Sequence, residues 1–431
     1  MKLKLLTSSL LLLLLVLNLN AKEVYNIDEL ILKALKNSPD LKISSLQYNA
    51  SQERSNIASA NYLPKVDLHA QVGLNGMSDI PTDNMLNDKL LLGNLSLKQI
   101  LYDFEKTSGN VDVFNYESES FSMSNMQYIS NKKMDVKLAY YDVLKAKALI
   151  EVNKENVKLN EAQLYRSKKY FTAGIRTKID VSDAEVELIK SKLDLQNSQY
   201  NLKLAYATLD KVVGFSELER TYNIYSKKLD LTNLFSRITN YDLTLIKSIE
   251  FAYENRYELK QFSFQIKSAQ ASSRVASSRY YPALYLNADY TKQELDKFKT
   301  TIPQDKWQAS INLDWNIYEG GATSADSQEK KIQIKITKSK FQNAKLSVKK
   351  EVTQAFINVY KMKDSVELSQ SLVKVSDEKF NQAGKRYEHG LSDYIELQQA
   401  RQGYIDAKAS LVITYYNYYA ATAVLDNVIG R

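Results

Sequence analysis

In each half of the chain, apolar residues recur at a spacing of seven over many helical turns. The first series comprises Val136, Val143, Ile150, Val157, Leu164 and Phe171, followed after a gap by Val181, Leu188, Leu195, Leu202 and Leu209. The second comprises Val352, Val359, Val366, Val373, Phe380 and Tyr387, followed by Leu397, Tyr404, Leu411, Tyr418 and Leu425. This spacing is typical of coiled-coil seams. The pattern therefore predicts two pairs of long helices.

A glycine interrupts each pair of helices. Gly174 lies in YFTAGIRTKIDVSDA and Gly390 lies in RYEHGLSDYIELQQA. Glycine accepts the backbone geometry that a tight reversal requires, so we expect these two residues at the tips of helical hairpins. A helix over 104–172 would be about 100 Å long. A compact globular domain of this size has no use for such a helix.

The chain contains two copies of one structural unit. The hairpin glycines and the segments LDKVVG and LDNVIG match at an offset of 216 residues, and SANYLPKVDLHA matches SSRYYPALYLNA at an offset of 218. Such internal similarity indicates a repeated architecture. We expect a first repeat over 22–214, a connector over 215–240 and a second repeat over 241–431. Each repeat would begin with one helix, over 27–61 and 241–279.

Between this first helix and the hairpin, each repeat has two short segments in which apolar and polar residues alternate. Alternation of this kind predicts β-strands, at about 65–76, 94–102, 283–291 and 307–318. Strands of this length can cross a bilayer when tilted. Trp307 and Trp315 lie on the apolar side of the last strand, as in the aromatic girdles of membrane barrels. A soluble sandwich is the alternative, but the sequence offers no other sheet for these faces to pack on.

Four strands are too few to form a closed membrane barrel. An open sheet edge in hydrocarbon leaves unpaired N–H and C=O groups, each costing several kcal/mol. The smallest familiar barrels have about eight strands. The chain must therefore oligomerise, and two copies would supply eight strands and three copies twelve. The wider barrel has room for a water-filled lumen.

Composition narrows the possible functions. Residues 1–21 read as a secretory signal peptide. There is no cysteine, and His69 and His389 are the only histidines, so we expect no disulfide, no metal site and no cofactor. The net charge is +8, but basic and acidic residues are interspersed, which argues against a nucleic-acid partner. No catalytic motif is present, so we do not expect an enzyme.

The chain as a whole resembles the TolC-like outer-membrane efflux proteins. The resemblance rests on NIDELILKALKNSPDLK, the NYLP and RYYP turns, IYEGG after the fourth strand, and the two hairpin tips. It implies a mainly α-helical homotrimer, with a 12-stranded β-barrel in outer-membrane lipid, a 12-helix α-barrel extending into the periplasm, and an equatorial collar of 215–240. It also implies an exit duct whose tips, at Gly174 and Gly390, contact a periplasmic adaptor and an inner-membrane transporter.

The resemblance further assigns acidic residues to the periplasmic entrance. Glu396 falls where the family carries the first acid of a cation-binding ring, and Gln399 stands where a second acid is usual. Asp180 and Asp183 occupy the corresponding positions of the first hairpin. The alternative is that Glu396 and Asp180 are ordinary solvated charges.

Tyr387 and Asp180 match a tyrosine and an aspartate that hydrogen-bond across neighbouring helices in the family and hold the entrance shut. The family's partner arginine is replaced by Ser392, and Arg176 is a candidate substitute. Tyr387 also occupies a heptad position, so a purely structural role is the alternative.

The competing function is a periplasmic coiled-coil tether, or a trimeric surface adhesin, without a channel. Either would explain the heptads but not the alternating segments at matching places in both repeats. The sequence does not name the cargo. Multidrug efflux, type I secretion and metal export use ducts of this design, and the partner pump selects the substrate.

Overall fold

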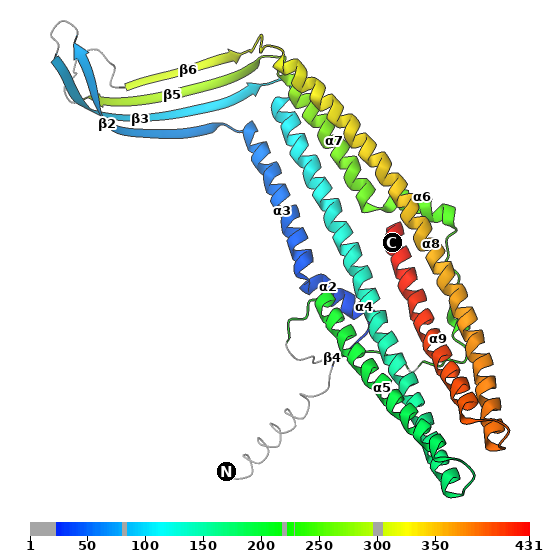
Figure 1. The fold of residues 1–431 in the computed structure, drawn as a ribbon. Coiled ribbons are helices and arrows are strands. Elements are labelled where there is room, and N and C mark those ends of the chain that lie inside the picture. Colours follow the sequence, from blue (N-terminus) through cyan, green and yellow to red (C-terminus); the bar gives the residue numbers. More distant parts are fainter. Residues whose placement is uncertain (1–22, 80–83, 218–221, 228, 296–304) are drawn as a thin grey trace, which may run out of the picture. The chain divides into compact units, whose positions relative to one another are not determined.

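A computed structural model describes residues 23–79, 84–217, 222–227, 229–295 and 305–431 (Figure 1). The predicted signal peptide lies outside these residues. The chain divides into two units. The hairpin unit comprises the described residues of Met1–Lys42, Gln127–Arg256 and Ser347–Arg431, and the sheet unit comprises Ile43–Met126 and Tyr257–Leu346.

The four longest helices come in two matching pairs. Helices α4 (Lys106–Thr172) and α8 (Ala322–Glu388) have 67 residues each, and α5 (Lys178–Val213) and α9 (Tyr394–Ile429) have 36 each. Equal lengths at an offset of 216 residues show the duplication in the backbone itself. Among the described residues, no helix is both long enough and apolar enough to cross a membrane.

Both hairpin turns follow the same local rules. Gly174 and Gly390 have φ of 71° and 72°, a left-handed geometry that favours glycine. Thr177 caps α5 in a capping box with Asp180, and Asp393 accepts a hydrogen bond from the Glu396 backbone N–H at the start of α9. These caps satisfy N–H groups that have no partner within the helix.

The first helix of each repeat is divided, and the prediction of single helices over 27–61 and 241–279 was wrong. The first copy forms α2 (Ile27–Asn37), α3 (Pro39–Ser59) and a short 3₁₀ turn, η1 (Ala60–Tyr62). Pro39 lacks an N–H and begins the second segment, a position that suits proline. The second copy forms α6 (Leu245–Asn255) and α7 (Tyr257–Ser278) and breaks at Arg256, whose backbone is extended.

The sheet unit contains a four-stranded antiparallel sheet in the order β2-β3-β5-β6. The strands are β2 (Lys65–Asp79), β3 (Asn84–Tyr102), β5 (Ala283–Leu295) and β6 (Asp305–Asp314). β3 begins ten residues before the segment expected at 94–102, because pairing with β2 carries it through a stretch where alternation is broken. β6 ends before Trp315, which lies outside the strand.

The register of the sheet separates apolar from polar side chains. Leu68 pairs with Leu95, Leu95 with Tyr290, and Tyr290 with Trp307. The next row across the same strands consists of Asp67, Ser96, Asp289 and Gln308. Directly paired residues share a face and successive residues alternate, so one face is apolar and the other polar. The apolar face is not covered by any described element: Val72 is 83% exposed and Trp307 is 79% exposed.

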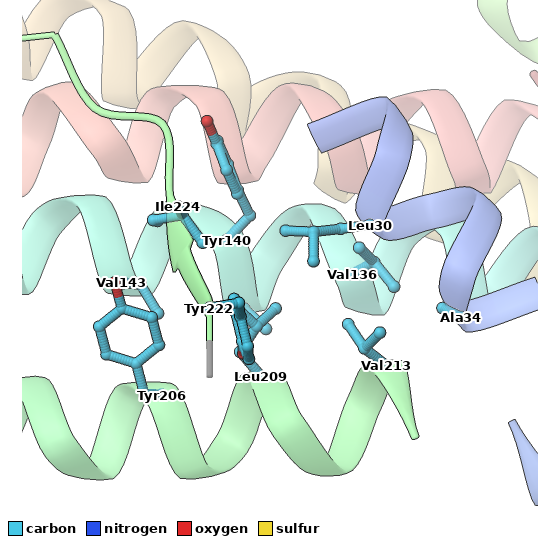
Figure 2. Close-up of a cluster of buried hydrophobic side chains, with 11 residues drawn as sticks. Leu30, Ala34, Val136, Tyr140, Val143, Tyr206, Leu209, Val213, Tyr222 and Ile224 are labelled. Carbon is cyan, nitrogen blue, oxygen red and sulfur yellow. The ribbon is translucent and has the colours of Figure 1, made fainter. Parts of the chain in front are cut away.

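The core of the hairpin unit lies where the first hairpin meets α2 and a small parallel sheet (Figure 2). Strands β1 (Glu23–Tyr25) and β4 (Tyr222–Ile224) form this sheet. The cluster comprises Leu30, Ala34, Val136, Ala139, Tyr140, Val143, Tyr206, Leu209, Val213, Tyr222 and Ile224. Three of these residues belong to the predicted heptads and are completely buried: Val136, Val143 and Leu209.

The turn from strand to long helix is strained in the first repeat. Phe104 and Glu105 have φ of 46° and 68°, whereas the equivalent residues of the second repeat are Gly320 and Gly321. A left-handed backbone costs non-glycine residues about 1–3 kcal/mol. The Phe104 ring stacks on Tyr281 at a centroid distance of 4.8 Å, which helps to hold the turn in this conformation.

Replacing Glu105 with glycine should stabilise the protein. Glu105 is exposed, so Glu105→Gly removes backbone strain without opening a cavity, and we expect about 1 kcal/mol more resistance to unfolding. Thermal unfolding in detergent, followed by circular dichroism, measures the change. As the matched control, Gly321→Ala at the equivalent position should lower stability by a similar amount. A less stable Glu105→Gly variant would contradict the strain argument.

Candidate functional site

Arg176 of the first hairpin reaches the tip of the second hairpin. Its guanidinium carbon lies 4.6 Å from the centroid of the Tyr387 ring. Its Nη2 atom donates hydrogen bonds to the backbone oxygens of Tyr387 at 3.3 Å and of Ser392 at 3.2 Å. The Tyr387 oxygen belongs to the last turn of α8, where it also accepts a hydrogen bond from the Gly390 backbone N–H at 3.2 Å, and the end of a helix attracts positive charge. Arg176 therefore links the two hairpins through a cation–π contact and two hydrogen bonds.

Tyr387 is a core residue as well as the partner of Arg176. Its side chain is 2% exposed and packs with Ala184, Ala383, Tyr394 and Leu397. Burial raises the pKa of Tyr387, and the negative charge of Asp180 adds to this, while Ser167 and Arg176 oppose it. The phenol is therefore neutral at physiological pH. Its hydroxyl lies near Ser167 but has no well-formed hydrogen bond among the described residues.

The structure does not show the expected hydrogen bond between Tyr387 and Asp180. The Asp180 carboxylate instead accepts hydrogen bonds from the backbone N–H of Thr177 at 3.0 Å and from its hydroxyl at 3.2 Å. Asp180 thus caps α5 and acts on Tyr387 only through its charge. Within a single chain, Tyr387 is therefore linked to the first hairpin by Arg176 and not by Asp180.

The candidate ring acids lie on two different helices. Glu396 forms an ion pair with Arg386, with 3.1 Å between Oε1 and Nε, and its side chain is 43% exposed. Asp183 is half-buried on α5, and Gln399 is exposed on α9. No ion pair or hydrogen bond within the described residues joins Glu396 to Asp180 or Asp183. A single chain therefore presents these acids separately.

The hairpins also contain buried polar residues that the apolar periodicity of the sequence does not reveal. Arg401 is 3% exposed and Glu187 is 9% exposed, and Arg401 counteracts the burial that raises the pKa of the neighbouring Tyr394. α4 carries a row of buried polar side chains at Asn156, Asn160, Gln163 and Ser167. Their spacing of four, three and four residues is a helical face. Searching for apolar periodicity alone overlooks it.

Aromatic side chains also gather where strands meet helices in the sheet unit. Six are exposed there: Tyr62, Tyr102, Tyr280, Tyr281, Trp315 and Tyr318. Trp315 donates a hydrogen bond from Nε1 to the Tyr280 backbone oxygen at 3.2 Å. Trp307 lies eight residues earlier, near the far end of β6, about 27 Å away along an extended chain. In a strand tilted by about 40°, that length would span about 20 Å of barrel height, close to the apolar band of about 25 Å in outer-membrane barrels.

Solved structures place this fold among outer-membrane channels. CusC matches with a TM-score of 0.81 at 15% identity, covering 94% of this chain and 92% of that one. The outer-membrane protein VceC of Vibrio cholerae matches with a TM-score of 0.78 at 16% identity, covering 94% and 96%. The CmeC outer-membrane channel of Campylobacter jejuni matches with a TM-score of 0.81 at 14% identity, covering 94% and 85%.

Sequence comparison identifies the family. The outer membrane protein TolC of Vibrio cholerae is 22% identical over 418 residues, covering 95% of this chain and 90% of its own length. The outer membrane efflux protein family model matches residues 30–215 and 249–431. The chain therefore belongs to the outer membrane efflux protein family. Its place is the outer membrane and its role is efflux, and the family is one of transport proteins rather than enzymes.

The link made by Arg176 can be tested by hydrogen exchange at the second tip. Arg176→Ala should speed amide exchange over 388–394 about tenfold, because a partly buried cation–π contact and its hydrogen bonds are worth about 1–2 kcal/mol. Tyr387→Phe keeps the ring and the backbone oxygen, so it should leave this exchange unchanged. Lys178→Ala, which removes a cation–π contact with Phe171 inside the first hairpin, is the control. Faster exchange in Tyr387→Phe than in Arg176→Ala would favour a latch through the hydroxyl.

Proposed function

We propose that three copies of this chain form the outer-membrane exit duct of a tripartite system, either an efflux pump or a type I secretion machine. The observation that carries the proposal is the two-faced sheet with both edges open. Among the described strands, β2 and β6 each pair on one side only, and the sheet has one apolar and one polar face. Three such sheets, joined β2 to β6, would give twelve strands with lipid outside and water inside.

The four described helices of the sheet unit form a row whose two outermost members have a helix neighbour on one side only. Ser51 of α3 contacts Ser118 of α4, Arg274 of α7 pairs with Asp112 of α4, and Arg279 of α7 pairs with Asp326 of α8. The order is therefore α3, α4, α7, α8, with α3 and α8 outermost. Both expose apolar side chains: Ile43, Leu46 and Ile57 on α3, and Ile332, Ile336 and Leu346 on α8. A second copy placing its α3 against α8 would cover these residues.

The hairpin unit also exposes a stripe that another copy would cover. On α5, Ile179, Val186, Leu193 and Tyr200 follow a heptad spacing and are 49% to 69% exposed. On α8, the exposed apolar residues are Ile357, Leu368, Leu372 and Val375. Such stripes form helix–helix seams in coiled coils. A ring of three chains would then contain twelve helices, with the connector 215–240 forming a collar outside so that the tunnel stays open.

Exposed side chains of the sheet and of the hairpin tips would contact lipid and partner proteins. Trp307 and Trp315 would mark the two interfaces of the outer membrane. At the tips, Ile175 and Leu391 follow the two glycines and are 65% and 69% exposed. We assign these tips to a periplasmic adaptor that bridges to an inner-membrane transporter. An apolar side chain beside each tip glycine gives such a partner a place to anchor.

The closed entrance would be held by the tip contacts already described. Arg176 fastens the second hairpin to the first, Tyr387 supplies its stacking surface, and Asp180 fixes the start of α5. In a trimer, Glu396 and Asp183 would each be present three times around the entrance. Carboxylates brought together in this way attract cations and resist full ionisation. Gln399 would make this ring less acidic than the family pattern.

The assembly is tested by planar-bilayer conductance together with the mass of the detergent-solubilised protein. The wild-type chain should be a conducting trimer. Val186→Glu with Leu193→Glu should prevent trimer formation and conductance, because charge replaces apolar contact in the α5 seam. Gln196→Glu with Gln199→Glu, which adds the same charge at exposed positions of α5 outside that heptad series, is the matched control. A tether or adhesin would give no conductance even in the wild type.

The acidic ring is tested by divalent-cation block of the same current. Glu396→Gln should weaken the block about tenfold, because three charges are removed at once from a narrow entrance. The control is Asp406→Asn, an exposed acid further along α9. If block is equally strong in wild type and Glu396→Gln, Glu396 is a solvated surface charge paired with Arg386 and has no part in a ring.

A further inference from the structure

A cavity of about 420 Å³ lies in the sheet unit, where the first repeat passes from β3 into α4. Part of its lining is aromatic: the Phe104 ring stacks on Tyr281 at 4.8 Å between centroids and packs edge-on against Tyr102 at 4.7 Å. The lining also includes the charged residues Glu105 and, from α7, Arg274. Small-molecule sites have volumes of about 300–1,000 Å³, so the cavity is large enough for a ligand. We call it the junction cavity.

A β-bulge places one of these rings on the apolar face of the sheet. The register of β3 against β5 shifts between Ile100 and Tyr102, so that Tyr102 pairs with Leu284. Leu284 pairs in turn with Leu313 on the apolar face. Without the extra residue, alternation along β3 would turn Tyr102 to the polar face. Bulges are frequent beside functional sites, where they redirect a side chain, and this one makes the junction cavity adjoin the apolar face.

The chain accepts backbone strain at two residues that line the cavity. Phe104 and Glu105 both have a left-handed backbone, and the equivalent turn of the second repeat consists of two glycines, Gly320 and Gly321. Glycines would relieve the strain in the first repeat as well, but they would remove a ring and a carboxylate from the cavity. Strained residues of this kind are concentrated at functional sites. The strain therefore indicates that these two side chains have a use.

The helix that completes the cavity differs between the repeats in the same way. At the offset of 218 residues, Arg274 and Tyr281 correspond to Asn56 and Leu63 of the first repeat. One copy of the unit thus has a guanidinium and an aromatic ring where the other has an amide and an aliphatic side chain. Both members of the first pair line the cavity. The lining is therefore specific to one repeat and is not required by the shared architecture.

Two opposite charges at the cavity have bonding capacity to spare. The Arg274 side chain is 45% exposed and pairs with Asp112 through Nη2, which leaves further N–H donors of the guanidinium for a ligand. Glu105 is exposed, and within the described residues only its backbone oxygen is engaged, by the Gly109 N–H at 2.9 Å. Guanidinium groups bind phosphate, whereas a carboxylate beside aromatic rings attracts an ammonium group. The cavity suits a ligand that carries both.

We propose that the junction cavity binds the headgroup of a zwitterionic phospholipid, of the phosphatidylethanolamine type. This inference rests on the proposed barrel, in which the apolar face lies in lipid and the end of the sheet next to the helices lies at the periplasmic interface. Glycerophospholipids form that leaflet of an outer membrane, and aromatic side chains are enriched at the level of their headgroups. Arg274 binds the phosphate, Glu105 and the neighbouring rings receive the ammonium group, and the acyl chains follow the apolar face.

Native mass spectrometry of the detergent-solubilised trimer tests the proposal, with phosphatidylethanolamine and phosphatidylglycerol of identical acyl chains as probes. The wild type should bind one phosphatidylethanolamine per chain about tenfold more tightly than phosphatidylglycerol, which has no ammonium group for Glu105. Glu105→Gln should abolish this preference, because the amide keeps the size of the side chain and loses its charge. Glu119→Gln, at an exposed acid of α4 that does not line the cavity, is the matched control and should keep the preference.

The phosphate contact is tested by a second pair of variants. Arg274→Gln should weaken the binding of both lipids about tenfold, because both carry the phosphate. The matched control is Arg279→Gln. Arg279 is similarly exposed, at 43%, and is also held in ion pairs, with Glu319 and Asp326, but it does not line the cavity. This control should bind both lipids as the wild type does.

Three outcomes would overturn the proposal. Equal binding of the two lipids by the wild-type trimer would leave Glu105 without a role. Equal weakening in Arg274→Gln and Arg279→Gln would show a general effect of charge. Binding of free phosphoethanolamine as tightly as the lipid would make the cavity a site for a soluble phosphate compound. Conductance is measured on the same preparations, so a conducting trimer without lipid preference would refute this site and leave the proposed duct intact.

Discussion

The backbone of the two edge strands sets the main constraint on this molecule. Among the residues that the structure describes, β2 and β6 each have a neighbouring strand on one side only, so a row of backbone N–H and C=O groups has no ladder partner on the other. The same sheet has an apolar face, and in hydrocarbon such unpaired groups would cost several kcal/mol each. One chain cannot meet both demands. In the proposed trimer, pairing with further copies would satisfy the edges and keep the apolar face in lipid. The open edges therefore favour oligomerisation independently of any argument about transport.

The sequence predicts those features that depend on side-chain periodicity. Heptads located Val136, Val143 and Leu209, which are fully buried, and alternation assigned the two faces of the sheet. Features that depend on tertiary neighbours were missed. The early start of β3 comes from pairing with β2. The helix break between α6 and α7 at Arg256 is not marked by a proline in the sequence. Arg176 binds backbone oxygens of the other hairpin, and no pattern in either hairpin encodes that contact.

The tip illustrates why family residues do not transfer one by one. Sequence comparison paired the hydroxyl of Tyr387 with Asp180, but the structure uses the ring and the backbone oxygen of Tyr387 and binds them through Arg176. Ser392, at the position of the missing arginine, contributes its backbone oxygen to the same guanidinium. The link between hairpins is therefore present with different donors.

Duplication explains how this chain could diverge without losing its architecture. Both repeats supply long helices of the same lengths, as they must if they occupy equivalent places in the proposed ring. Residues outside those requirements are free to differ, and they do. Gly320 and Gly321 adopt the left-handed backbone of the strand-to-helix turn without strain. Phe104 and Glu105 adopt it with strain, and the Phe104 ring stacks on Tyr281. The segment 331–345 of α8 has five lysines, whereas the equivalent segment 115–129 of α4 has none. Positions where the repeats disagree are therefore where specific interactions of this protein should be sought.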